Sequence, residues 1–272
     1  MSSTNDMFKT FSVIIVTGGS SGIGKSYIEH AIQGNPNALI CNLSRTPFFA
    51  QKGADIVKQI TCDMSKAEAI EEAYTILTSL INVHAKTGRV MLINNSGFGS
   101  YGLFPEPNIS ENLGIIDVNI KGVIHLTGLC LPLIKQRGGS ILTVASTAAF
   151  QPTPWLATYG ASKAFILNWS LALNEELRGS GVNVLAVCPG PTATQFFKRA
   201  GLTQGSVSPS MSQTSDQVVE ESIAALKKGK SFIVTGWKNR LLTLFSGFTP
   251  RVLVTRIAAS MIARYRTNTV KR

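Results

Sequence analysis

The 272-residue chain has few cysteines and histidines, and neither type is arranged as a metal site. The four cysteines form no CxxC pair and lie in or beside apolar segments, which is typical of buried free thiols in a reducing compartment. The three histidines have neither metal-ligand spacing nor carboxylates clustered around them. We therefore predict four free thiols and no bound metal.

Long apolar runs are also missing. No run reaches the roughly 18 residues that a membrane-spanning helix requires. Residues 1–12 lack a basic region followed by a separate apolar stretch, which argues against a secretion signal. With 44% hydrophobic and 15% charged residues, the chain can bury a substantial core. These features predict a cytoplasmic protein within the size range of one α/β domain.

Acidic residues are absent from the last fifth of the chain. Residues 222–272 contain 11 Lys+Arg and no Asp or Glu, whereas residues 1–221 contain 15 of each sign and are neutral. The whole net charge of +11 therefore belongs to the C-terminal part. This pattern indicates one basic appendage, and it predicts no nucleic acid as a partner.

Short runs of Val, Ile and Leu alternate with helical patterns, which indicates a parallel sheet covered by helices on both faces. Most runs lack strict alternation, as expected for strands buried on both faces. The expected strands are 12–17, 38–43, 55–62, 89–94, 139–145, 183–188 and 231–235. The expected helices are 24–32, 66–85, 108–137, 157–178 and 216–228. Residues 1–236 are thus predicted to form one three-layer α/β/α domain with a doubly wound parallel sheet of about seven strands.

Two segments interrupt this alternation. Residues 189–215 are rich in Pro, Gly, Ser and Thr but include Phe196, Phe197 and Leu202, which predicts a flap over a ligand. Residues 237–272 are expected to form a helical extension of the same domain, with two short helices separated at 247–250. Thr249 is the expected N-cap of the second helix and Pro250 its first residue.

A glycine-rich turn, Thr17-Gly-Gly-Ser-Ser-Gly-Ile-Gly24, lies between an expected strand and an expected helix. Glycines allow a sharp turn and the close approach of a pyrophosphate, to which the helix N-terminus offers free N–H groups. The spacing is Gly-x3-Gly-x-Gly rather than the common GxGxxG. On its own, this turn also fits a merely tight strand-to-helix connection.

The end of the second strand favours NADP(H) as the cofactor. NAD-binding folds place an acid there, against the ribose 2′-hydroxyl, but this chain has Ser44 and Arg45. A serine removes the repulsion that a carboxylate would exert on a 2′-phosphate, and an arginine can bind that phosphate with two donors. The alternative is that Arg45 is only a solvated loop cation.

A tyrosine and a lysine are spaced for acid/base chemistry. Tyr159 and Lys163 lie one turn apart on one face of an expected helix, and Ser146 ends an expected strand at the ligand-binding edge of the sheet. A tyrosine titrates near ~10 and is a poor proton donor unless a cation stabilises its phenolate. We expect Lys163 to be that cation. Each residue alone is common, but their occurrence together with the glycine turn predicts a site.

With these motifs in this order, residues 12–236 resemble the short-chain dehydrogenase/reductase family, which has a Rossmann-like fold. The resemblance rests on the glycine turn, Asp63, Asn94-Asn-Ser-Gly97, Asn119, Ser146, Tyr159-x3-Lys163, and Pro189-Gly190 followed by Thr194. The family usually has Asn-Asn-Ala-Gly at the third of these motifs, so Ser96 is a small departure.

The resemblance implies the following roles. Tyr159 would be the general acid in carbonyl reduction and the base in alcohol oxidation. Lys163 would lower its pKa and bind the nicotinamide ribose, Ser146 would orient the substrate oxygen, and Asn119 would hold a water for proton exchange. The residues expected to bind the dinucleotide are Gly18, Ser20, Ser21, Gly22, Ile23, Gly24, Ser44, Arg45, Asp63, Asn95, Ser96, Gly97, Tyr159, Lys163, Pro189, Gly190, Thr192 and Thr194.

Large apolar residues follow the ends of the later strands and recur in the flap. They predict a pocket for a lipophilic carbonyl compound, such as a fatty-acyl chain, a steroid-like ketone or an aromatic ketone. Some of them can instead merely pack the loops. The expected residues are Phe98, Tyr101, Phe150, Trp155, Phe196 and Phe197.

The basic extension, residues 237–272, has two interpretations. Its apolar residues recur at helical spacing with arginines among them. It can be a helix pair that rests on anionic lipid at a membrane surface, or one that docks an acidic carrier protein or the phosphates of coenzyme A. It can also cover the substrate pocket or a subunit interface, which the interruption of its apolar side by Arg264 slightly favours. The resemblance further implies a homodimer or homotetramer built on the long helices.

The sequence therefore predicts an NADP(H)-dependent reductase of a hydrophobic ketone or acyl substrate. One alternative is an NAD-dependent alcohol dehydrogenase of the same fold. Another is a non-catalytic NADP(H)-binding or membrane-associated module, which the four intact catalytic positions disfavour.

Overall fold

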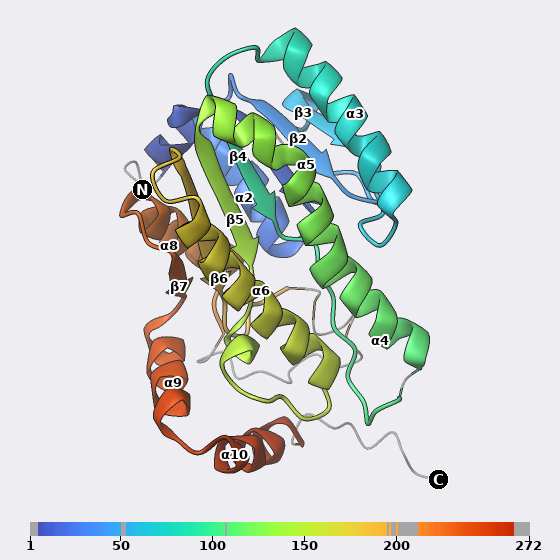
Figure 1. The fold of residues 1–272 in the computed structure, drawn as a ribbon, viewed down its shortest axis with the longest axis vertical. Helices are drawn as coiled ribbons and strands as arrows, with labels where there is room; N and C mark the ends of the chain where they lie inside the picture. Colours follow the sequence, from blue (N-terminus) through green and yellow to red (C-terminus); the bar gives the residue numbers. More distant parts are fainter. Residues whose placement is uncertain are drawn as a thin grey trace.

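The computed structural model describes residues 5–49, 53–106, 108–194, 196, 200 and 212–263. Seven parallel strands form one sheet in the order β3-β2-β1-β4-β5-β6-β7 (Figure 1). The strands are β1 Phe11–Thr17, β2 Leu39–Leu43, β3 Val57–Ile60, β4 Arg89–Asn94, β5 Gly139–Val144, β6 Val182–Cys188 and β7 Phe232–Val234. This sheet confirms the predicted fold class.

Helices cover both faces of the sheet. They are α2 Gly22–Gly34, α3 Ala67–His84, α4 Ile109–Ile116, α5 Gly122–Arg137, α6 Ala157–Glu176, α8 Ser215–Lys227, α9 Trp237–Phe248 and α10 Arg251–Ala263. Helices α2 and α8 pack on one face, and α3, α5 and α6 pack on the other. The order of connection reverses between β1 and β4, and doubly wound sheets bind their ligands at such a switch point.

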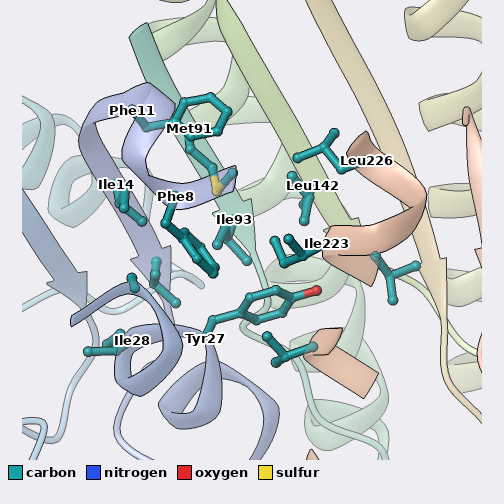
Figure 2. Close-up of a cluster of buried hydrophobic side chains, with 14 of the residues drawn as sticks. Phe8, Phe11, Ile14, Tyr27, Ile28, Met91, Ile93, Leu142, Ile223 and Leu226 are labelled. Carbon is teal, nitrogen blue, oxygen red and sulfur yellow. The ribbon is translucent and has the colours of Figure 1, made fainter. Parts of the chain in front are cut away.

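The core between the sheet and the α2–α8 layer is apolar and continuous. Figure 2 shows Phe8, Ile14, Met91 and Leu142 pointing into it from one side, with Ile223 facing them from α8. A buried polar contact joins the two helices beside these apolar side chains: the Tyr27 hydroxyl lies 2.6 Å from that of Ser222. Tyr27 is fully buried, and burial raises its pKa well above the usual value, so it stays neutral.

Three expected elements differ in the structure. The third strand is short, because residues 54–56 form a 3₁₀ turn before it. The expected helix 108–137 is broken into α4 and α5 by a π-helical segment, Asp117–Lys121. Thr249 does not cap α10: its hydroxyl donates to the Phe245 carbonyl of α9, so it closes the preceding helix.

Within the described residues, only the run 109–137 is long and apolar enough to cross a membrane. This run belongs to the core, because Leu126, Cys130 and Ile134 of α5 are buried against the sheet. The proposed boundary of the extension lies between β7 and α9, and the division of the chain at residue 236 stays a prediction. The flap residues Phe197 and Leu202 lie outside the described residues, as do Arg264 and Arg266.

Candidate active site

A cavity of about 620 Å³ opens at the carboxyl ends of the strands. It is lined by residues that follow each of β1 to β6, and by the start of α6. All the predicted catalytic and dinucleotide-binding residues line this cavity except Gly24 and Asn119. The fold therefore brings together side chains and turns that are far apart in the sequence.

The glycine turn forms the floor of this cavity. Gly18 and Gly22 have φ values of +67° and +57°, a region that favours glycine. A Cβ on Gly24 would lie 2.4 Å from Asn95 Nδ2 and 2.5 Å from the Gly18 carbonyl, so this glycine permits close packing of α2. Ser21 is the N-cap of α2, but its side chain makes no capping bond. The N–H groups of the first turn thus remain available to an anion, and the cradle fits a dinucleotide pyrophosphate.

Neighbouring strands hold the turn in place. The Thr17 hydroxyl oxygen accepts hydrogen bonds from the Asn95 and Ser96 N–H groups, at 3.0 and 2.9 Å. The Asn95 side chain donates back to the carbonyls of Thr17 and Gly18. From β2, the fully buried Asn42 accepts from the Gly19 N–H at 2.9 Å. Asn42 was not among the predicted site residues, and its position within an apolar strand was the only sequence signal for it.

Ser44, Arg45 and Asp63 lie at the end of the cavity that adjoins β2 and β3. Arg45 is exposed. Partial burial raises the pKa of Asp63, but hydrogen bonds from Ser65 and the charges of Arg45 and Lys66 outweigh it, so this pKa lies below its usual value. A carboxylate beside an exposed guanidinium at this position can bind the polar groups of an adenosine.

Tyr159 lies at the other end of the cavity, on the first turn of α6. Burial raises the pKa of Tyr159 to about 12, and a hydrogen bond with the Ser146 side chain acts in the opposite direction. This upward shift differs from the downward shift that the sequence predicts. The reason is that burial removes the phenolate from water, and without a bound dinucleotide the neighbouring groups stabilise its charge by less than this desolvation costs.

Lys163 is 5% exposed and points toward the same end of the cavity. Its ammonium lies 5.8 Å from the centroid of the Tyr159 ring and donates to the Val144 carbonyl at 2.7 Å. Burial lowers the pKa of Lys163 to about 8. A Cβ on Gly97 would lie 3.2 Å from the Lys163 Nζ, so a larger residue at position 97 would press on the ammonium.

Asn119 lies behind this cluster, within the π-helical segment. It is 1% exposed, and its side chain donates to the Phe98 carbonyl and the Ser162 hydroxyl while accepting from the Phe98 N–H. Short π segments inside helices recur at functional sites. In this structure Asn119 ties the loop after β4 to α6, and its expected water-holding role stays a prediction.

The loop after β6 completes the cavity with Pro189, Gly190, Thr192 and Thr194. A Cβ on Gly22 would lie 3.1 Å from Thr194 Cγ2, so this loop crosses directly over the glycine turn. Thr192 forms a bridge with Gln213, which anchors the loop beside the start of α8.

Two of the expected substrate-facing residues, Phe98 and Phe196, line the cavity. The rings of Phe196 and Tyr159 are 5.2 Å apart, so Phe196 lies beside the reactive phenol. Tyr101, Phe150 and Trp155 do not line the cavity, which corrects the prediction for them; Phe150 packs on a buried cluster with Val123 and Ile166 instead. The sequence missed Ile262 of α10, which does line the cavity.

A buried phenol and ammonium that share one cavity with a glycine turn, at the carboxyl edge of a doubly wound sheet, are the parts of an oxidoreductase site. The comparison with known families agrees: the model described as short chain dehydrogenase matches residues 12–205. The chain belongs to the short-chain dehydrogenase family, as the resemblance in its sequence implied.

Curated relatives share about a third of the aligned residues. An uncharacterized oxidoreductase of Staphylococcus epidermidis is 31% identical over 185 residues, which cover 67% of this chain and 78% of the relative. A very-long-chain 3-oxoacyl-CoA reductase of Schizosaccharomyces pombe is 30% identical over 257 residues, which cover 81% and 75%.

Solved structures share the fold. A 3-ketoacyl-(acyl-carrier-protein) reductase of Brucella melitensis complexed with NADH is 25% identical, with a TM-score of 0.68 over 82% of this chain and 93% of that one. A short chain dehydrogenase of Burkholderia cenocepacia in complex with NADP is 23% identical, with a TM-score of 0.72 over 94% and 98%.

Proposed function

We propose that this protein is an NADP(H)-dependent reductase of a hydrophobic ketone or acyl-type carbonyl compound. The observation that carries the proposal is that Tyr159 and Ser146 line the same cavity as the glycine turn and Arg45. The first pair can protonate and hold a carbonyl oxygen, and the second pair can hold a phosphorylated dinucleotide.

The preference for NADP(H) rests on Ser44 and Arg45. The exposed guanidinium lines the cavity directly after β2, at the position where an acid would repel a 2′-phosphate. Asp63, which follows β3, also lines the cavity. The Burkholderia structure in complex with NADP supports this choice, whereas the Brucella structure holds NADH. Since neither likeness decides the cofactor, the charge at position 45 is the main support.

A bound dinucleotide would supply the hydride to the carbonyl carbon. Residues of the protein would then bind and protonate the carbonyl oxygen of the substrate. Ser146 would donate a hydrogen bond to it. As the carbon accepts the hydride, the π electrons of the C=O bond move onto the oxygen, and Tyr159, which is neutral at physiological pH, transfers its proton to that oxygen. Lys163 lies close enough to stabilise the resulting phenolate.

The substrate class follows from the walls beside the phenol. Phe98, Leu156, Phe196 and Ile262 are apolar and line that end of the cavity. They suit a lipophilic chain or ring better than a sugar or an acid. Relatives described as ketoacyl reductase HetN of Nostoc, 31% identical over 71% of this chain, and as very-long-chain 3-oxoacyl-CoA reductase support an acyl substrate.

We also propose that the enzyme is a homo-oligomer. Ile109, Leu113, Ile124 and Phe165, on α4, α5 and α6, are exposed apolar residues. Such residues on the long helices would be covered in a homodimer or homotetramer. The proposed location is the cytoplasm.

Purified protein tests the proposal directly. NADPH consumption is followed with a 3-oxoacyl thioester, a steroid ketone and a small water-soluble aromatic ketone, and each assay is repeated with NADH. We expect turnover with at least one of these ketones and a preference for NADPH. Protein that binds NADPH but turns over none of them would favour a binding module.

A further inference from the structure

Helix α9 turns its polar side chains inward and its apolar side chains outward. Asn239 and Thr243 are buried, at 4% and 8% exposure, and the Asn239 side chain donates to the Thr235 carbonyl at 2.8 Å. Five large apolar residues on the opposite side are 46–84% exposed and follow an i, i+4, i+7, i+8, i+11 pattern, which forms one continuous stripe: Trp237, Leu241, Leu244, Phe245 and Phe248. A surface helix of a soluble domain normally has the reverse arrangement.

Helix α10 extends this exposed surface. Its inner face is formed by Val254 and Ala258, which are buried, and by Ile262, which lines the active-site cavity. Its outer face exposes Val252, Leu253 and Ile257. The inner face therefore covers the pocket, as one interpretation of the sequence predicted, but that packing leaves the outer face unexplained. Figure 1 shows both helices at one end of the molecule, away from α3.

Basic residues accompany the exposed apolar surface. At ~100° per residue, Lys238 and Arg240 flank the two sides of the α9 stripe, and the exposed Arg256 lies between Val252 and Leu253 on the outer face of α10. The Lys238 ammonium lies 5.6 Å from the Trp237 ring centroid, and Arg240 forms an ion pair with Glu221. No acidic residue occurs anywhere in 222–272. The surface is therefore complementary to a partner that is both apolar and anionic.

We propose that the outer face of α9 and α10 docks on an anionic membrane surface. The apolar stripe would enter the boundary between headgroups and acyl chains, with Trp237 at the interface and the lysines and arginines reaching lipid phosphates. A second copy of the chain fits less well, because an isologous contact would set these same cations against each other. A protein partner would need a surface shaped to fit two helices that meet at an angle, whereas a fluid bilayer does not.

Docking would link the exposed outer face of α10 to the active site, because the same helix also forms part of the cavity wall. Ile262 of α10 lines the cavity, and the Tyr101 hydroxyl donates to its carbonyl at 3.4 Å. A docked enzyme would hold this wall of the cavity near the bilayer, where a lipophilic substrate is dissolved. This last step rests on the proposed function, whereas the docking itself does not.

Co-sedimentation of the full chain with vesicles tests the docking. We expect binding to vesicles that contain phosphatidylglycerol, weaker binding to pure phosphatidylcholine, and release by salt. The double variants Phe245→Ser/Phe248→Ser and Lys238→Glu/Arg256→Glu should each weaken binding by about tenfold or more. Val83→Ser in the last turn of α3 and Lys86→Glu just after that helix make the same kinds of change at exposed positions and should bind as the wild type does.

Other occupants give different results. Wild-type protein that fails to bind anionic vesicles overturns the proposal. A Phe245→Ser/Phe248→Ser variant that keeps full vesicle binding also overturns it. If that variant in addition changes from dimer to monomer in solution, the surface is a subunit interface. Turnover of the small water-soluble ketone without vesicles tests the enzyme separately, and these variants should retain it.

Discussion

The Lys163 ammonium lies 5.8 Å from the Tyr159 ring centroid. Burial disfavours the charged form of each group, which raises the pKa of Tyr159 to about 12 and lowers that of Lys163 to about 8. In the protein alone the phenol therefore keeps its proton at physiological pH. A protonated phenol is the form that carbonyl reduction requires. Its phenolate needs stabilisation only after the proton has been transferred.

Replacing Tyr159 by Phe removes this proton donor but keeps the ring that packs beside Phe196. We expect kcat to fall by a factor of about 100 to 10,000, which is the usual contribution of general acid catalysis, with little change in the dissociation constant for NADPH. Steady-state kinetics and NADPH fluorescence measure the two effects. Tyr74→Phe on α3 is the matched control, and a Tyr159→Phe variant with nearly normal kcat would remove the assigned role.

Replacing Arg45 by Asp should change the choice of dinucleotide. The carboxylate would repel a 2′-phosphate and accept a hydrogen bond from a free ribose 2′-hydroxyl, so KM should rise for NADPH and fall or stay constant for NADH. We expect the ratio of kcat/KM values to shift toward NADH by at least about tenfold, since charge-assisted bonds contribute about 1.5–3 kcal/mol. Arg178→Asp, an exposed position outside the cavity, should leave that ratio unchanged. An unchanged ratio in Arg45→Asp would show that Arg45 is only a solvated cation.

Much of the site could be predicted because backbone requirements leave local marks in the sequence. Gly18 and Gly22 occupy positive φ angles, and Tyr159 and Lys163 share one face of one helix. The strands could be predicted for a similar reason, since burial of both faces makes them continuous runs of Val, Ile and Leu, as in β1 and β6.

The remaining features depend on contacts between distant segments. The sequence left open whether the extension covers the pocket, and it did not indicate that Ile262 is the residue of α10 that lines a cavity formed mainly by residues 18–196. The π segment at Asn119 follows from bonds to Phe98 and Ser162, which local periodicity does not reveal. The orientation of α9 is also set by tertiary packing, because Asn239 fits against Gly190, where a Cβ would lie 2.2 Å from the Asn239 side chain.

Replacing Asn119 by Ala should destabilise the protein as well as the site. The substitution leaves the Phe98 N–H and carbonyl groups and the Ser162 hydroxyl without this partner in a buried region. Since an unsatisfied buried polar group costs about 1–3 kcal/mol, we expect the free energy of unfolding to fall by about 2–3 kcal/mol. Urea unfolding measures the change, with the exposed Asn168→Ala on α6 as the control that should change it by less than about 0.5 kcal/mol. A loss that small in Asn119→Ala would contradict its proposed positioning of the loop.

The lowered pKa of Lys163 predicts how stability depends on pH. The folded protein releases this proton near pH 8, whereas the unfolded chain holds it until about 10.5. Between these values the unfolded state binds more protons, so the free energy of unfolding rises with pH, and this contribution is lost as pH falls through about 8. Relative to Lys163→Met, the wild type should gain up to about 1.4 kcal/mol per pH unit between pH about 8 and 9.5. Urea unfolding of both proteins without dinucleotide measures this difference, and other groups cancel in the comparison. The exposed Lys135→Met should follow the wild type. A difference that stays flat across this range would mean that burial does not disfavour the Lys163 ammonium.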